Sequence, residues 1–290
     1  MSLRLKFNLV LILVFLVGFV AAGIVSYQLL QNNARDEVVR SAQLLIESAL
    51  SVRKYTVDQI RGPLEEAGDA VFRPQTVPAY AATEVFSEVR KRYPEYSYKE
   101  ATLNPTNPRD RAADWESDIV NRFRQVDDVK EIIAERDAST GRQLYLARPI
   151  KISNPACLAC HTTAETAPPA MVKVYGPANG FGWKLNEVVG AQLVVVPMEL
   201  PQRNAQRAFI TFMSSLALIF LAVFVVINGL LSFLIVRPIR QLSAVADKVS
   251  VGDFREAEFS EKGRDEIAVL ASSFNRMRRS LEKAIQMIDE

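Results

Sequence analysis

The sequence predicts a small α+β domain held between two membrane-spanning helices and followed by a coiled-coil segment. Two long apolar blocks, residues 7–30 and 208–236, frame the middle of the chain. Between them, residues 31–207 place helical patterns first and strand-like runs later, which is typical of α+β domains. After the second block, apolar residues recur at heptad spacing, which is typical of coiled coils.

Both apolar blocks are long enough to cross a membrane, which takes about 20 apolar residues in a helix. The first follows Arg4 and Lys6 and exceeds the ~7–15 apolar residues of a cleaved signal peptide, so we interpret it as an anchor. The second contains no charged residue and precedes Arg237 and Arg240. By the positive-inside rule, both termini are cytoplasmic and residues 31–207 are extracytoplasmic, or periplasmic. The sequence therefore predicts a two-pass protein of the inner (cytoplasmic) membrane, with the lipid bilayer as a partner.

The composition excludes several function classes. The net charge is +2 and no basic patch is present, so no nucleic-acid partner is predicted. Only one histidine occurs in the chain, and no phosphate-binding loop, cyclase or kinase signature follows residue 285. We therefore predict that the chain is not an enzyme.

Both cysteines and the single histidine fall within one run, Cys157-Leu158-Ala159-Cys160-His161. The C-x-x-C-H spacing is the attachment signature of a c-type haem. Two thiols add to the vinyl groups of one porphyrin, and the following imidazole binds the iron as proximal ligand. We predict one covalent haem c, with thioethers from Cys157 and Cys160 and with His161 as iron ligand. The oxidising compartment indicated by the basic flanks suits this chemistry.

Three alternatives exist for this motif: a vicinal disulfide, a redox-active pair and half of a zinc site. Zinc needs four ligands, and the sequence has no second Cys/His cluster. A thioredoxin-like pair begins a helix in a βαβ unit, whereas this motif follows Asn154-Pro155 in a predicted loop. A bare redox or structural pair stays open.

The first apolar block continues as a helix through residues 31–64. The members of one seam recur at alternating steps of four and three: Val38, Ala42, Leu45, Ala49, Val52 and Thr56. This seam fits equally well a coiled coil with a second copy and an amphipathic helix lying on its own domain. Gly62-Pro63 is expected to weaken the helix, and Arg73-Pro74 marks a loop.

The rest of the middle segment supplies two helices and four strands. A helix is predicted at residues 79–92, ended by Pro94, and another begins with Asp114 as its N-cap. The predicted strands are 96–99, 129–135, 143–150 and 188–196. Ser139-Thr140-Gly141 joins the middle two as a hairpin, and a Pro/Gly-rich loop spans residues 167–183.

Beyond the second block, two heptad helices flank an extended connector, an arrangement that forms a parallel four-helix bundle in a dimer. The apolar positions are Ile239, Leu242, Ala246 and Val249, then Ile267, Leu270, Phe274, Met277, Leu281, Ala284 and Ile288. Four segments resemble the HAMP linker domain of bacterial receptors: Arg237-Pro238-Ile239, Gly252-Asp253-Phe254, Asp265-Glu266-Ile267 and Ser273-Phe274-Asn275-Arg276-Met277. The resemblance implies a homodimer through the HAMP and juxtamembrane helices, which relays movement to a cytoplasmic output protein such as a kinase.

The middle segment, over roughly residues 35–200, resembles the Tll0287-like haem-sensor domain. The resemblance is carried by the C-x-x-C-H motif together with Asn104-Pro105-Thr106-Asn107, Asp114-Trp115-Glu116, Tyr175-Gly176 and Gly180-Phe181-Gly182-Trp183-Lys184. It implies a PAS-like fold that holds one c-type haem for redox or small-gas sensing. Relatives place a cysteine on the other haem face, and this sequence has no third cysteine to take that role.

The second axial position of the iron is therefore unassigned. Met171, Met198 and Tyr55 are candidate distal ligands, and an open or water-bound iron is the alternative. Candidates for the haem edge are Arg148 and Lys173 for the propionates and Trp115, Phe181 and Trp183 for the ring.

These predictions divide the chain into five parts. They are the cytoplasmic N-terminus 1–6, transmembrane helices 7–30 and 208–236, the haem domain 31–207, and the HAMP domain with the start of a signalling helix, 237–290. The leading hypothesis is a sensor that relays a redox change, or binding of NO, CO or O2, through the membrane to HAMP and a separate output partner. The alternative is a membrane-anchored c-type cytochrome for electron transfer. Because receptors of this design usually continue into an output domain, we expect either a docking partner or a chain shortened relative to its relatives.

Overall fold

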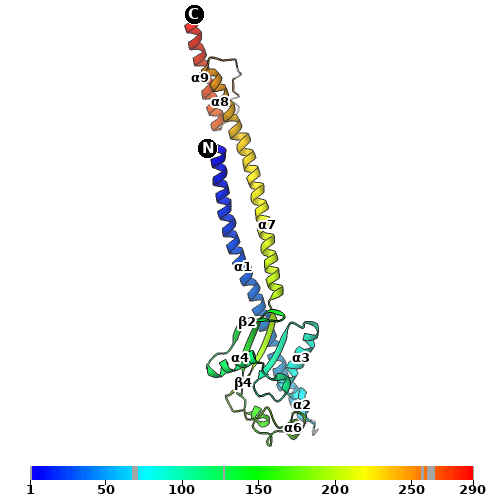
Figure 1. Ribbon diagram of the computed structural model, residues 1–290. Helices are drawn as coiled ribbons and strands as arrows, with labels where there is room; N and C mark the ends of the chain where they lie inside the picture. The colour runs from blue at the N-terminus through cyan, green and yellow to red at the C-terminus, as the bar shows by residue number, and fades with distance from the viewer. Residues whose placement is uncertain (1, 67–70, 127, 256–257, 260–264, 290) are drawn as a thin grey trace. The chain divides into compact units, whose positions relative to one another are not determined.

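The computed structural model describes residues 2–66, 71–126, 128–255, 258–259 and 265–289 (Figure 1). The chain divides into two compact units: Gln28–Ala208, which we call the sheet domain, and Met1–Tyr27 with Phe209–Glu290, which we call the helical unit. The helices are α1 (Leu3–Tyr55), α2 (Arg61–Glu66), α3 (Pro78–Arg92), α4 (Asp114–Gln125), α5 (Leu158–His161), α6 (Pro169–Tyr175), α7 (Glu199–Leu230), α8 (Arg237–Ser250) and α9 (Glu266–Asp289). The strands are β1 (Ser97–Thr102), β2 (Ile132–Ala138), β3 (Gly141–Lys151) and β4 (Val188–Pro197).

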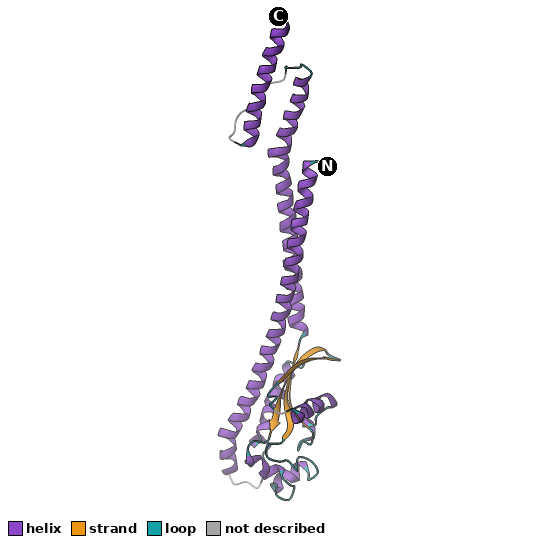
Figure 2. Cartoon of the chain, turned by 90° about the vertical axis from the view of Figure 1, so that its left-hand side faces the viewer, coloured by secondary structure: helices purple, strands orange, loops and turns teal. Residues whose placement is uncertain are grey.

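The four strands form one antiparallel sheet in the order β1-β4-β3-β2 (Figure 2). Successive side chains of a strand point to opposite faces. On β4, Val194 and Val196 accordingly join a core with α1 and α3, whereas Ala191 and Leu193 join a second core with α4. The sheet therefore has helices on both faces, and the predicted α+β class with antiparallel strands is confirmed.

The seam on α1 packs against the chain's own sheet. Val38, Ala42 and Ala49 of the predicted seam are almost fully buried, together with Ile46, whereas the predicted Leu45 is only partly buried. They share one core with residues of three strands: Tyr98, Leu144, Leu146, Val194 and Val196. Of the two interpretations left open by the sequence, the amphipathic helix on its own domain holds for this face. A second copy cannot pair along it, because the sheet already occupies it.

The first long helix is irregular just before Gly62-Pro63, where the sequence predicts a weakening. The chain stays helical to the end of α2, and the irregular turn lies earlier, as a π-helical turn at Thr56–Ile60. Proline lacks an N–H and its ring collides with the carbonyl four residues before it, so the preceding turn must widen. A second π-helical turn, Leu231–Val236, precedes Pro238 in the same way.

Four other elements differ from the expectation, and the first is β2, which covers Ile132–Ala138 rather than residues 129–135. β1 extends to Thr102 because its pairing with β4 continues as far as Gly190. The N-cap of α4 is Ala113, whose backbone N–H donates to Glu116 Oε2 at 2.8 Å, so Asp114 is already helical. The predicted loop 167–183 contains α6, which begins at a proline, a residue tolerated in the first turn.

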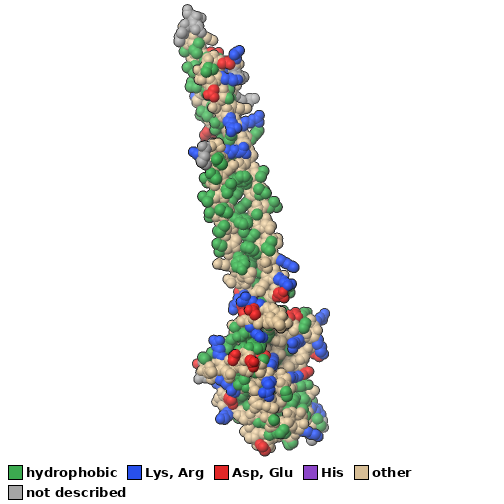
Figure 3. Space-filling view, in the orientation of Figure 1, with side chains coloured by type: hydrophobic (Ala, Val, Ile, Leu, Met, Phe, Trp, Pro, Cys, Tyr) green, Lys and Arg blue, Asp and Glu red, His purple; other side chains and the backbone are tan. Residues whose placement is uncertain are grey.

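In the helical unit, α1 and α7 contact each other through aromatic rings. Phe15 and Phe220 stack at 4.8 Å between ring centroids, and hydrophobic side chains cover this pair of helices in Figure 3. The helical stretches Arg4–Leu64 and Glu199–Ser250 each contain a window long and apolar enough to cross a membrane. Two such helices flanking the sheet domain are consistent with a membrane protein, and the predicted orientation of the termini stays a prediction.

Polar side chains of α9 hold the connector that follows α8. Asn275 is fully buried, accepts from the Phe259 backbone N–H at 3.1 Å and donates to the Phe259 carbonyl at 2.9 Å. Arg278 donates to the Phe254 carbonyl at 2.6 Å. Connector residues 256–257 and 260–264, and the Ile288 side chain of the predicted heptad, lie outside the described residues. Four heptad positions stay substantially exposed in the single chain: Ile239, Leu270, Met277 and Leu281.

Candidate functional site

The C-x-x-C-H motif, which the sequence placed in a loop, instead forms a short helical corner after β3. Asn154 Oδ1 accepts from the Ala156 N–H at 2.9 Å and so caps the 3-10 turn Pro155–Cys157, which leads directly into α5. Residues three apart on a helical turn lie on the same face. Cys157 and Cys160, both half-buried, therefore present their thiols on one side of the corner.

The imidazole of His161 is oriented by its surroundings. Its Nδ1 lies 2.7 Å from the Gly180 carbonyl oxygen and 3.5 Å from Thr106 Oγ1, and its ring stacks on Trp183 at 3.8 Å and 11°. A carbonyl can only accept, so Nδ1 carries the proton and donates to it. Nε2 then keeps the lone pair that a metal ligand needs.

Burial keeps this imidazole neutral. It lowers the pKa of His161, and the bond to the Gly180 carbonyl offsets the decrease only in part. A neutral ring is the form that ligates metals. Protonation state and tautomer thus both suit His161 to bind iron through Nε2.

Two loops close on either side of His161. A Cβ on Gly180, whose φ is +85°, would lie 2.0 Å from Thr106 Oγ1 and 2.8 Å from Thr106 Cα. Only glycine allows this approach, which brings the loop around residue 180 against the loop around residue 106. The Trp183 N–H also donates to the His161 carbonyl at 3.2 Å. The segments 104–107 and 180–184 therefore lie next to each other, beside His161.

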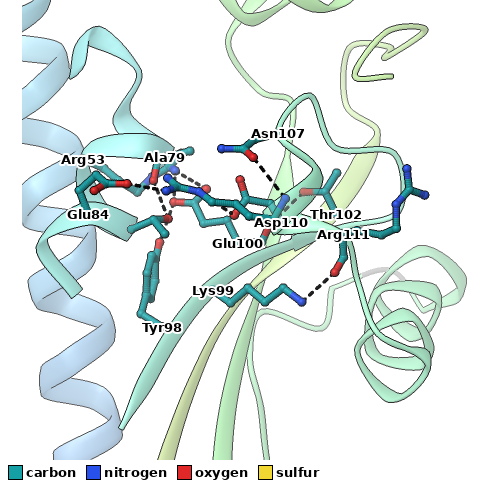
Figure 4. A network of polar contacts seen from close by, with 12 residues as sticks. Arg53, Ala79, Glu84, Tyr98, Lys99, Glu100, Thr102, Asn107, Asp110 and Arg111 are labelled. Carbon is teal, nitrogen blue, oxygen red and sulfur yellow. Dashed lines mark hydrogen bonds and ion pairs between the residues drawn. The ribbon is translucent and has the colours of Figure 1, made fainter. Parts of the chain in front are cut away.

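Sequence reasoning missed a buried polar network at this end of the domain (Figure 4). Arg53 of α1 bonds both carboxylate oxygens of Glu100 on β1, and Tyr98 Oη donates to Glu100 Oε1 at 2.7 Å. Burial and the Glu100 charge raise the pKa of Tyr98 well above its ordinary value, so its hydroxyl stays a donor. No spacing links these residues. The only sequence signal was a glutamate directly after the predicted strand 96–99.

Arg53 also lies near the motif. Burial lowers its pKa, but the charge of Glu100 and the hydrogen bond to it, with further electrostatic interactions with Tyr98 and Cys157, outweigh burial and raise it. The guanidinium therefore stays charged within electrostatic reach of the Cys157 sulfur.

The sequence matches the Tll0287-like family over residues 31–197, more than half of the chain. The chain belongs to the Tll0287-like family. Residues 230–283 match the HAMP domain. A similar solved structure is that of the cyanobacterial haem-protein Tll0287, with 16% sequence identity, a TM-score of 0.44, and coverage of 56% of this chain and 95% of that chain. No curated protein matches the chain. Both family resemblances inferred from the motifs are thus confirmed.

Within the Tll0287-like domain, the three candidate distal ligands are in different environments. Met198 is buried in the core at the far end of β4, whereas the strand begins beside the segment that leads into the motif. A strand of this length spans roughly 30 Å, so the fold does not bring Met198 to His161. Met171 is buried on α6, ten residues after the histidine, and Tyr55 is half-exposed at the end of α1.

The residues predicted to contact the haem propionates or the haem ring also lie in different parts of the Tll0287-like domain. Arg148 already binds Glu47 at 2.6 Å and Glu131 at 2.8 Å. Trp115 packs on Tyr145 in the α4 core. Trp183 is the one of the three tryptophan and phenylalanine candidates that contacts His161 among the interactions of the described residues. Phe181 is half-buried and Lys173 is exposed.

Proposed function

We propose that this protein is a membrane-bound signal transducer with one covalent haem c, attached to Cys157 and Cys160 and ligated by His161. The observation that carries the proposal is the orientation of His161: its Nδ1–H is bonded to Gly180, and a neutral Nε2 is left for iron. Two thiols on one face of a helical corner suit the two vinyl groups of one porphyrin. Membership of the Tll0287-like family adds support.

The bound haem would supply an iron that responds to reduction or to a small gas such as NO, CO or O2. The chain's own residues orient the histidine, enclose its ring and connect the site to two long helices. α7 begins two residues after the central strand β4, and α1 packs along the sheet. A signal requires an element with two states that the site biases. We assign that element to α1 and α7, with the sheet domain extracytoplasmic and both termini cytoplasmic.

The HAMP match supports the rest of the relay. In this proposal HAMP forms a parallel homodimer and passes the movement to a separate cytoplasmic output protein, a kinase or similar. The chain itself catalyses no reaction. Its exposed heptad positions, such as Leu270 and Leu281, supply the dimer contact.

Covalent attachment is the first test. The full chain, produced with a haem-attachment system, is expected to keep its haem after acid–acetone extraction and to give a c-type haemochrome spectrum. The double variant Cys157→Ser/Cys160→Ser is expected to lose all covalent haem. His161→Ala keeps the thioethers but loses the proximal ligand, so its Soret band should change while its haem content does not. Haem that extracts freely from the parent chain would refute the proposed attachment.

Signal relay is tested separately in the HAMP region. In a haem-loaded chain carrying Leu281→Cys, a short bis-maleimide is expected to link two copies, with a yield that changes on reduction of the haem. Glu282→Cys, the next position along α9, is the control for general reactivity. A yield at Leu281→Cys that is the same in both redox states, together with rapid electron exchange with a redox protein, would favour the electron-transfer alternative instead.

A further inference from the structure

A buried ion pair joins α1 to the sheet near the haem-attachment motif. The side chains of Arg53 and Glu100 are 26% and 5% exposed, and Tyr98 completes the pair from the same strand. The other ion pairs between α1 and the sheet are more exposed: Arg35 with Glu135 and Glu47 with Arg148. Most of the remaining α1 contact is apolar and built from small residues such as Ala42 and Ala49. Among the described residues, Arg53–Glu100 is thus the most enclosed charged link between α1 and the sheet.

The pair is linked to the haem-attachment region in two ways. On one side, the Arg53 guanidinium is within electrostatic reach of Cys157. On the other side, Asp110 ends the short turn that follows Thr106, and Thr106 lies beside His161 Nδ1. Asp110 interacts electrostatically with Glu100, so two carboxyl groups belong to this network (Figure 4).

Asp110 is the carboxyl best placed to exchange a proton. Glu100 already accepts from Arg53 and Tyr98, whereas the Asp110 side chain is 17% exposed and its nearest cation, Arg109, is 3.7 Å away. The charged and titratable groups that face Asp110 are Arg109 on its own turn, Lys99 and Glu100 on β1, and Tyr175 on α6. Burial raises the pKa of Asp110 to about 6, Glu100 adds to the increase, and Arg109 and Lys99 oppose it.

We propose that Arg53, Glu100 and Asp110 form a charge relay between the haem iron and α1, in which Asp110 takes up a proton when the iron is reduced. The relay rests on the proposed function. A one-electron donor, such as a quinol or an electron-transfer protein, converts ferric to ferrous iron, and the Asp110 carboxylate takes one proton from solvent. Loss of a positive charge at the iron favours the neutral carboxyl. Neutral Asp110 no longer repels Glu100, which strengthens the hold of β1 on Arg53 and α1.

The test is the midpoint potential of the haem in the detergent-solubilised full chain, titrated optically between about pH 5 and pH 9. Below the Asp110 pKa of about 6, both redox states are protonated and the potential is constant. Between this pKa and the higher pKa that Asp110 has after reduction, reduction brings a proton, so the potential falls as pH rises, by up to ~59 mV for each tenfold drop in proton concentration. Above both pKa values Asp110 is ionised in both redox states and the potential is constant again. Asp110→Asn is expected to abolish the slope, and Asp110→Glu to keep it. Asp118→Asn, at an exposed position of α4, is the matched control and should retain the slope.

Amide hydrogen exchange measures whether α1 is held more firmly against the sheet after reduction. Amides in residues 50–60 of the parent chain are expected to exchange more slowly after reduction, and this difference should vanish in Asp110→Asn and in Arg53→Gln. A haem-loaded Asp110→Asn chain that keeps the full slope would assign the proton to another group, such as a propionate, and overturn the relay. Identical exchange in both redox states would also overturn it. A parent chain without covalent haem would instead refute the proposed function, and the relay with it.

Discussion

Gly180→Ala is expected to lower the free energy of unfolding of the sheet domain by about 2–5 kcal/mol. The new Cβ meets two obstacles at once. The backbone of residue 180 has φ +85°, which costs a non-glycine residue about 1–2 kcal/mol. The methyl group would also lie 2.8 Å from Thr106 Cα, a backbone atom that cannot rotate away. Moving the two loops apart would take the Gly180 carbonyl from His161 Nδ1 and release the imidazole orientation.

Gly182→Ala separates these two costs. Gly182 has nearly the same φ, +81°, but nothing lies within 4 Å of its Cβ position, so only the backbone strain remains. Both tryptophans of the chain, Trp115 and Trp183, lie in the sheet domain, so denaturant unfolding of the haem-free full chain followed by tryptophan fluorescence measures both variants. We expect the unfolding midpoint to move at least twice as far for Gly180→Ala as for Gly182→Ala. Equal shifts would mean that the contact with Thr106 yields easily and does not hold the loop.

The sequence predicts well those elements that depend on residues close together in the chain. The β-branched run at residues 188–196 became the buried central strand, because nearly every residue in it is apolar and both sheet faces are covered. The seam of α1 was also visible from its spacing. The spacing could not decide what packs against that seam, because the sheet that covers it is built from residues far along the chain. The N-cap of α4 moved by one residue for a local reason, the reach of Glu116 to the Ala113 N–H.

The candidate site shows the same division. Attachment and ligation by Cys157, Cys160 and His161 were predicted from five consecutive residues, and the proposal still rests on them. The groups that orient or charge this motif come from other elements. Thr106 is 55 residues from His161, and Arg53 is 47 residues from Glu100. Composition likewise offered Met198 as a ligand, although position along β4 removes it from the site.

Ile46→Ala is expected to destabilise the sheet domain by about 2–5 kcal/mol, the usual cost of truncating a fully buried aliphatic side chain. Ile46 has no exposed surface and lies between α1 and the sheet, in the core that includes Leu144 and Leu146. Removing its branches leaves a cavity in that core, and helix and sheet cannot close it without moving other contacts. The same tryptophan-monitored unfolding of the full chain gives the loss.

Leu44 supplies the matched control on the opposite face of α1. It loses a similar volume on truncation but is 70% exposed, so Leu44→Ala is expected to change the free energy of unfolding by less than ~0.5 kcal/mol. The pair therefore tests which face of α1 is the buried one. If Leu44→Ala costs as much as Ile46→Ala, and its cost grows with protein concentration, the outer face of α1 is buried against a second copy. The juxtamembrane helices would then dimerise through the face opposite the seam, with the seam itself still committed to the sheet.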